Sequence, residues 1–124
     1  MSKARDFLVD KLTVLEPAFR VLPYARTIDP PRKPTVLVRV DRVEPAGEAG
    51  ARRVRRYRYA VIIIPIKTNG DPAEDELDAC LEDVLAAIDA APDVTWEAAE
   101  RGTWEDTAFP AYEVTVSVPL KIGA

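Results

Sequence analysis

The sequence contains no histidine, one cysteine and one methionine, and its five glycines are scattered singly. Without histidine, the usual general base of hydrolases and the commonest metal ligand are both missing. A single cysteine excludes a disulfide within the chain and a cysteine zinc cage. Glycines that never cluster cannot build a glycine-rich phosphate loop. We therefore expect no catalytic residue, no cofactor and no metal site, and we do not expect an enzyme.

Two residue types could still carry chemistry, and each has a structural explanation. Cys80 falls on the apolar stripe of a predicted helix without a histidine to activate it, so we interpret it as a core residue. Asp75 with Asp78, and Asp78 with Glu82, would be neighbours on that helix and could act as acid and base or hold magnesium. We interpret them as an acidic helix surface, because the helix dipole favours acidic residues near its start.

The chain also has little net charge and no long apolar run. A net charge of -4 argues against a general nucleic-acid binder and against stable attachment to anionic lipid. The longest apolar runs, such as residues 60–64, are far too short to span a bilayer, and the first residues lead into no signal-peptide core. We expect no membrane partner and a protein that stays in the cytoplasm where it is made.

The length of 124 residues is that of one domain, and we expect a single domain over residues 1–124. Leucines at helical spacing predict a first helix over residues 3–15, and residues 19–24 have the pattern of a short strand. A proline-rich link at residues 29–34 follows. The alternation of residues 35–43 then predicts a half-buried strand.

Residues 72–91 carry the strongest helix signal in the chain. Asp71 is placed to act as the N-cap, Pro72 to take the first helical position, and Glu74 lies three residues after the cap. Apolar residues at helical spacing form one stripe along the segment. This stripe predicts that one face of the helix packs on a sheet.

Two further strands are predicted near the end of the chain. Residues 94–98 read as a strand that Gly102 is expected to break or bulge. Residues 112–120 alternate clearly, and Pro119 marks an edge or the end of pairing because it cannot donate to a ladder. The predicted fold class is α+β: a small, mostly antiparallel sheet with a long protruding β-hairpin, packed by two helices.

The most informative segment is Val54–Ile64, which reads as one continuous strand. At about 3.3 Å per residue it would be roughly 36 Å long, about twice the usual length. Its second half is apolar throughout, which is typical of a strand buried on both faces, whereas its first half carries arginines. We therefore expect a hairpin over residues 41–58 to project from the core, with residues 44–51 as its mobile tip.

A projecting basic arm on an acidic protein needs a partner, and the chain itself offers one. Residues 72–91 contain seven acidic residues and no lysine or arginine. In a ring of identical subunits, one patch of each subunit meets a different patch of the next. The candidate residues of such a subunit or partner interface are Arg52, Arg53, Arg55, Arg56, Arg58, Glu74, Asp75 and Asp78.

Two other interpretations of the arginine-rich strand stay open. The charges could simply keep an exposed strand edge from aggregating. Alternatively, arginines interleaved with Tyr57 and Tyr59 could bind single-stranded nucleic acid, because aromatic rings stack on bases while basic groups neutralise phosphates. A salt-dependent interaction with an oligonucleotide would favour the second interpretation.

The order of the predicted elements resembles that of the tail terminator proteins of long-tailed bacteriophages (siphoviruses), especially those infecting actinobacteria. The likeness covers the whole chain: a short helix, a strand, a proline-rich link, a long hairpin, a capped helix, a tryptophan-bearing strand and a closing strand. Its most suggestive local pieces are Trp96 and the ending Pro110-Ala111-Tyr112-Glu113-Val114-Thr115-Val116.

This resemblance implies a structural protein of the virion tail or neck, without catalytic residues. It implies a homo-oligomer, a hexameric ring, that caps the head-proximal end of the tail tube, stops tube polymerisation and joins the tail to the neck. The expected partners are copies of itself, the tail tube protein and the head–tail connector, while genome DNA passes through the lumen without sequence-specific binding. Another neck, tail-completion or tail-tube protein stays open as an alternative, as does a small single-stranded nucleic-acid-binding module.

Overall fold

The computed structural model describes residues 3–16, 18–23, 33–45, 54–66, 70–103 and 110–121. Within these residues the elements follow the order α1 (Lys3–Leu12), the 3₁₀ turn η1 (Thr13–Leu15), β1 (Arg20–Leu22), β2 (Thr35–Pro45), β3 (Val54–Ile64), α2 (Gly70–Asp89), β4 (Thr95–Thr103) and β5 (Pro110–Lys121). The fold is α+β, as the sequence predicts.

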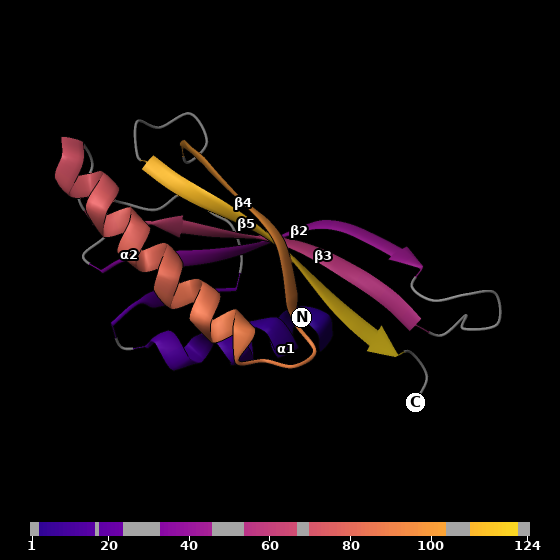
Figure 1. Ribbon diagram of the computed structural model, residues 1–124. Helices are drawn as coiled ribbons and strands as arrows, with labels where there is room; N and C mark the ends of the chain where they lie inside the picture. Colours follow the sequence, from indigo (N-terminus) through magenta and orange to yellow (C-terminus); the bar gives the residue numbers. More distant parts are fainter. Residues whose placement is uncertain are drawn as a thin grey trace.

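One sheet contains all five described strands, in the order β1-β2-β3-β5-β4. Only the β1–β2 pair is parallel; the β2–β3, β3–β5 and β4–β5 pairs are antiparallel. Both helices lie against the same face of this twisted sheet (Figure 1). We call this side the helix face and the opposite side the far face.

Alternating side chains divide the core between the two faces. The helix face and both helices share one buried cluster, which includes Leu8, Leu12, Val36, Val38, Tyr59, Val61, Ile63, Leu77, Val84, Ile88, Val114 and Val116. A smaller buried cluster on the far face consists of Leu22, Leu37, Ala60, Ile62, Ile64 and Ala111. Every residue from 60 to 64 is therefore at most 3% exposed, and the apolar half of β3 is buried on both faces as predicted.

The second helix begins slightly earlier than the sequence predicts. Gly70 opens it with φ at 75°, a backbone conformation that glycine adopts without strain. Asp71 therefore lies in the first turn of α2 instead of at the N-cap, and its carboxylate still suits the positive end of the helix dipole. The predicted apolar stripe is confirmed, and its buried members are Ala73, Leu77, Cys80, Val84, Ala87 and Ile88.

The two outer long strands each contain an irregularity that the sequence did not reveal. β4 runs unbroken through Gly102, so the prediction of a break there is wrong. Glycine keeps its backbone N–H and C=O and can remain in a ladder when the partner strand continues. The register of β4 shifts between Trp96 and Ala98, and that of β2 shifts between Val40 and Arg42. Such bulges bend a strand and increase its twist.

The predicted long hairpin is only partly described. β2 and β3 pair as far as Pro45 and Arg55, but the tip residues 46–53 lie outside the described part of the chain. β5 also pairs with β3 down to Val54 and Lys121, so the projecting structure is three strands wide and not an isolated ribbon. The ends of β2, β3 and β5 reach past the helices (Figure 1). We call this region the hairpin end of the sheet.

Candidate functional site

The candidate arginines lie at the hairpin end of the sheet. Arg55 and Arg56 are exposed, and because strand side chains alternate, Arg55 is on the helix face and Arg56 on the far face. Arg58 follows Arg56 on the far face and is half-buried. Arg52 and Arg53 lie outside the described residues. Of the candidate arginines that the structure describes, Arg55 and Arg56 are thus exposed, on opposite faces of one strand.

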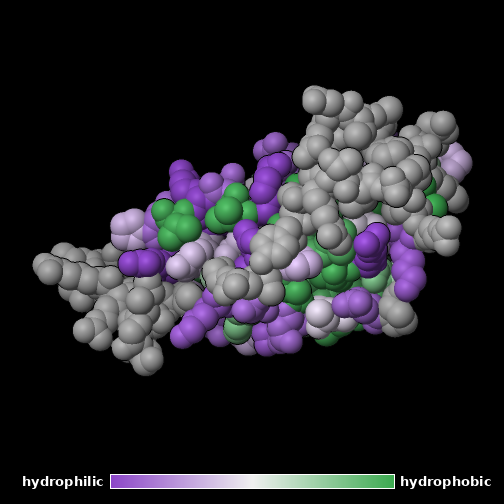
Figure 2. Space-filling view, turned by 180° about the vertical axis from the view of Figure 1, so that it is seen from behind, coloured by the Kyte–Doolittle hydropathy of each residue, from purple (hydrophilic) through white to green (hydrophobic). Residues whose placement is uncertain are grey.

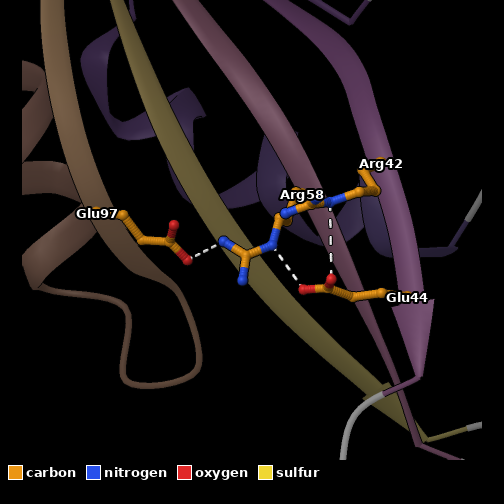
Figure 3. A network of polar contacts seen from close by, with 4 residues as sticks. All are labelled: Arg42, Glu44, Arg58 and Glu97. Atoms are coloured by element: carbon orange, nitrogen blue, oxygen red, sulfur yellow. Dashed lines mark hydrogen bonds and ion pairs between the residues drawn. The ribbon is translucent and has the colours of Figure 1, made fainter.

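Arg58 is held by carboxylates from two other strands (Figure 3). Its Nε donates to Glu44 Oε1 on β2 at 2.6 Å, and its Nη1 donates to Glu97 on β4. Arg42 adds a longer ion pair to Glu44, with 3.6 Å between Nε and Oε2. Since β4 pairs with β5 and not with β3, the guanidinium of Arg58 spans β5 to reach Glu97. Arg58 therefore ties three strands of its own subunit together.

This network shifts the titration of its members. The hydrogen bond from Arg58 holds the pKa of Glu44 below its ordinary value, and the charges of Arg58, Arg42 and Arg56 act in the same direction. The hydrogen bonds to Glu44 and Glu97 raise the pKa of Arg58. Both groups stay charged at neutral pH. The polar cluster is consequently a fixed set of charges on the far face, next to exposed Arg56.

The candidate acidic residues lie on the first half of α2. Glu74 accepts hydrogen bonds from Arg101 of β4, one of them between Nε and Oε2 at 3.0 Å. Asp78 accepts a hydrogen bond from the Tyr112 hydroxyl of β5 at 3.3 Å. Asp75 is exposed. Two of the three acidic candidates therefore have partners in their own chain that fasten α2 to the sheet.

These contacts also alter pKa values on the helix face. The hydrogen bond from Arg101 lowers the pKa of Glu74. Burial raises the pKa of Tyr112, and the neighbouring Asp78 carboxylate adds to this effect. Arg101 was not a candidate in the sequence, because nothing local in its strand indicates that it faces an acidic helix turn across space. The contact between Arg101 and the acidic start of α2 could be predicted from the alternation of β4 only if the strand order were already known.

The basic and acidic groups lie at opposite ends of the sheet. Arg101 pairs with Tyr112, which in turn pairs with Ile63 of β3. Ile63 is eight residues from Arg55 along that strand, a distance of about 26 Å at 3.3 Å per residue. The arginines at the hairpin end therefore cannot pair with the acidic start of α2 in the same subunit. Any contact between these two groups requires a second molecule.

The candidates for catalysis have ordinary structural surroundings. Cys80 is 5% exposed and packs in the main core, and burial raises the pKa of its thiol to about 11. Over the described ranges, no group of three or more acidic, cysteine or histidine side chains is arranged to hold a metal ion. None of the described helices combines the length and apolarity needed to cross a membrane.

The sequence of this chain was compared with protein-family models and with curated proteins. No protein-family model matches it, and no curated protein matches it significantly. The assignment of a function therefore depends on the residues and on the geometry described above.

Proposed function

We propose that this protein is a structural subunit that assembles side by side with copies of itself into a closed ring. The observation that carries the proposal is the separation of the exposed arginines and the acidic helix turn by about 26 Å along the sheet. Opposite charges at the two ends make the subunit polar. A ring of such subunits has one basic and one acidic rim, and each rim suits a different partner.

Within this class, the particular role we propose is that of a tail terminator of a long-tailed bacteriophage. The support is the order of elements, Trp96 and the ending at residues 110–116, together with the α+β fold that the resemblance implies. A terminator needs two unlike rims, because it meets the tail tube on one side and the head–tail connector on the other. In this role a hexameric ring caps the tube, and genome DNA passes through its lumen.

The nucleic-acid alternative has less support from the aromatic residues. Tyr57 and Tyr59 stack on each other with ring centroids 6.4 Å apart, and Tyr59 is 1% exposed. A buried ring cannot receive a base. Of these two rings, the half-buried Tyr57 alone is left beside Arg55 for stacking, whereas single-strand binding proteins use several exposed rings along a groove.

The proposal is tested by the mass of the purified protein in solution, by negative-stain images and by adding the protein to tails that lack a terminator. We expect rings, and tails that stop growing at one capped end. Rings that extend into tubes would instead identify a tube protein. A monomer at every concentration, combined with salt-sensitive oligonucleotide binding, would replace the proposal by the nucleic-acid module.

A further inference from the structure

Two strand edges of the sheet are open among the described residues. β1 pairs with β2 only along Thr35, Val36 and Leu37, so residues 38–45 have no described strand on their outer side. β4 is the last described strand on the other side, and no described residue pairs with its outer edge. Such edges present rows of N–H and C=O groups that can pair with another chain.

The directions of these two strands fit a side-by-side repeat. From β2 through β3 and β5 to β4, each strand is antiparallel to the one before, so β2 and β4 run in opposite directions. A rotation about an axis roughly along the strands preserves their directions. The β4 edge of one copy therefore meets the β2 edge of the next copy in an antiparallel arrangement, and the alternation of the sheet continues.

Exposed apolar side chains lie on both edges and on the same face. Val40 and Val43 on β2 are 46% and 48% exposed, and Trp96 on β4 is 38% exposed. Val40, Val43 and Trp96 pair with Tyr59, Tyr57 and Val116 in that order. These partners lie on the helix face, so all three exposed side chains project to that face. Seen from behind, a few hydrophobic side chains stand among hydrophilic ones toward the hairpin end (Figure 2). Joining the edges would bring Trp96 against the valines and bury them.

Trp96 is already oriented for such a contact. Its Nε1 donates to Asp89 Oδ1 of α2 at 3.2 Å, so the polar atom of the indole has a partner within the subunit. The residue remains 38% exposed on the strand with the open edge. Large aromatic rings with a satisfied polar atom are typical anchors of protein interfaces.

The charges on the far face complement one another across the same edges. On that face β2 carries Arg39, Arg42 and Glu44, a net positive set, and β4 carries Glu97 and Glu100. Their present ion pairs, such as Arg39 Nη2 to Glu113 Oε1 at 3.0 Å, leave the side chain of Arg39 44% exposed. Opposite charges on adjacent strands stabilise pairing, whereas joining two β4 edges or two β2 edges would place like charges together. The charges therefore favour the pairing of unlike edges.

We propose that residues 95–99 of β4 in one subunit pair with residues 38–42 of β2 in the next subunit, the rows that the two strands share and that β1 leaves open, so that a second copy of this chain is the partner of both edges. This proposal names the subunit contacts of the ring proposed above. The closure of the ring rests on that proposed function, whereas the choice of the two edges rests on the strand directions and side chains alone. The bulges of β2 and β4 occur in adjacent rows of the sheet. Charged and bulged edges resist indiscriminate pairing, so these irregularities restrict addition to a strand of matching shape.

The proposal is tested by cysteine cross-linking in a Cys80→Ala background. One double variant carries Val40→Cys and Trp96→Cys on the helix face. A second carries Arg39→Cys and Ala98→Cys, which occupy the same row of the far face and leave Trp96 in place. The control combines Val14→Cys with Trp96→Cys, since Val14 is 71% exposed and lies in η1, on neither of the two strands proposed to pair.

After mild oxidation or a short bismaleimide, we expect both edge variants to give ladders of covalent multimers on a denaturing gel, and the control to give none. Rings that form and cap tails without a ladder in either edge variant would overturn the edge proposal and leave the function standing. A monomeric protein that caps no tails would overturn both. Ladders of equal yield in the control would show unspecific collision and also contradict the proposal.

Discussion

At the scale of single residues, Arg58 shows how tertiary contacts decide what a charged side chain can do. Arg58 lies two residues after exposed Arg56 on the same face of β3, yet two carboxylates hold it in place. A guanidinium presents five donors in a planar fork and can bind two carboxylates at once in a fixed geometry. A lysine ammonium has three donors on one flexible point charge and holds two carboxylates less rigidly. Arg58 is therefore a structural residue of the far face, and Arg56 remains available to a partner.

Replacing Arg58 by methionine should raise the pKa of Glu44. The hydrogen bond from Arg58 is the main cause of its lowered value, so the folded state binds this proton less readily than the unfolded state. The corresponding stability is present above the ordinary carboxyl pKa and is lost as the pH falls through the lowered value. Carboxyl chemical shifts measured by NMR as a function of pH would show the change in Arg58→Met.

Arg42→Met is the matched control, because Arg42 lies at the longer distance of 3.6 Å and has only a secondary effect on Glu44. Its effect on the Glu44 titration should be clearly smaller. Equal shifts in the two variants would show that the general field of the arginines, and not the Arg58 hydrogen bond, controls this carboxyl.

Cys80 should be slow to react with thiol reagents in the native protein. Burial raises its pKa from 9.0 to about 11, so the folded state holds the proton more tightly and stability falls as the pH rises through that window. Cys80→Ala should remove this part of the pH dependence and cost about 1 kcal/mol through a small cavity. Denaturant melts between pH 8 and 11 and labelling rates would check both points, and rapid native labelling would contradict them.

At the scale of elements, the sequence predicts most helices and strands but not their partners. The bounds of β3 are those expected, because its apolar half and the turn-forming residue types on either side of it are local sequence signals. Pro119 lies at an edge, as predicted: β4 begins at Thr95 opposite Ser117, so on that side of β5 no described strand pairs with the proline, while Arg56 of β3 pairs with it on the other side. Hydrophobic alternation fixes which face a residue takes once the strand is known.

The strand order and the bulges could not be read from the sequence, since they depend on contacts between distant segments. β5 pairs with β3 on the edge opposite β2, so the expected two-stranded hairpin ribbon is a three-stranded structure. The bulge near Glu97 brings that carboxylate within reach of Arg58. A bulge residue is the one extra residue of its strand relative to the partner strand, and no local sequence pattern marks it. The contacts of Arg101 with α2 were missed for the same reason.

The attachment of α2 should weaken when Arg101 is replaced by alanine. Arg101 is the main partner of Glu74, and it connects the first half of α2 to β4. We expect faster hydrogen exchange in the first turns of α2 and little change near Ile88, which packs in the core. Glu100→Ala, at a neighbouring exposed position, is the control and should leave the exchange unchanged. Uniformly faster exchange along α2 would mean that the whole helix depends on this contact.

Shortening the loop between β2 and β3 tests whether it contributes to assembly. Deleting residues 48–52 leaves enough chain to connect the last pair, Pro45 with Arg55, by a tight turn. We expect a folded protein with an unchanged thermal transition that no longer assembles on tails. A deletion variant that still caps tails at the normal rate would show that the loop is no part of the interface.

At the scale of the whole molecule, the direction of the strands relative to the ring axis determines whether the charged groups lie on the rims of the ring or between its subunits. If unlike edges join, the strands run roughly along the ring axis, and the exposed arginines and the acidic turn of α2 fall on opposite rims. The charges then act between the ring and its partners. If the charged groups instead joined neighbouring subunits, the copies would have to be displaced by about 26 Å along the strands. Charge reversal distinguishes these two arrangements.

Reversing Arg53, Arg55 and Arg56 to glutamate is expected to abolish tail joining and to leave the ring intact. Exposed ion pairs are individually weak, so the effect comes from the cluster and from the like-charge repulsion that the reversal introduces. Reversing Lys11, Arg20 and Lys33 changes the net charge equally, away from the hairpin end, and should have no effect.

The outcome is measured by sedimentation of the variant and by its capping of terminator-free tails. Loss of the ring would place the arginines between subunits, and Asp75→Lys in the acidic turn should then restore it. Asp75 is the better choice for that rescue, since Glu74 and Asp78 already bind Arg101 and Tyr112. An intact ring that caps tails as well as the unmodified protein would mean that the arginines are a solvated edge, and the polar-ring proposal would lose its main support.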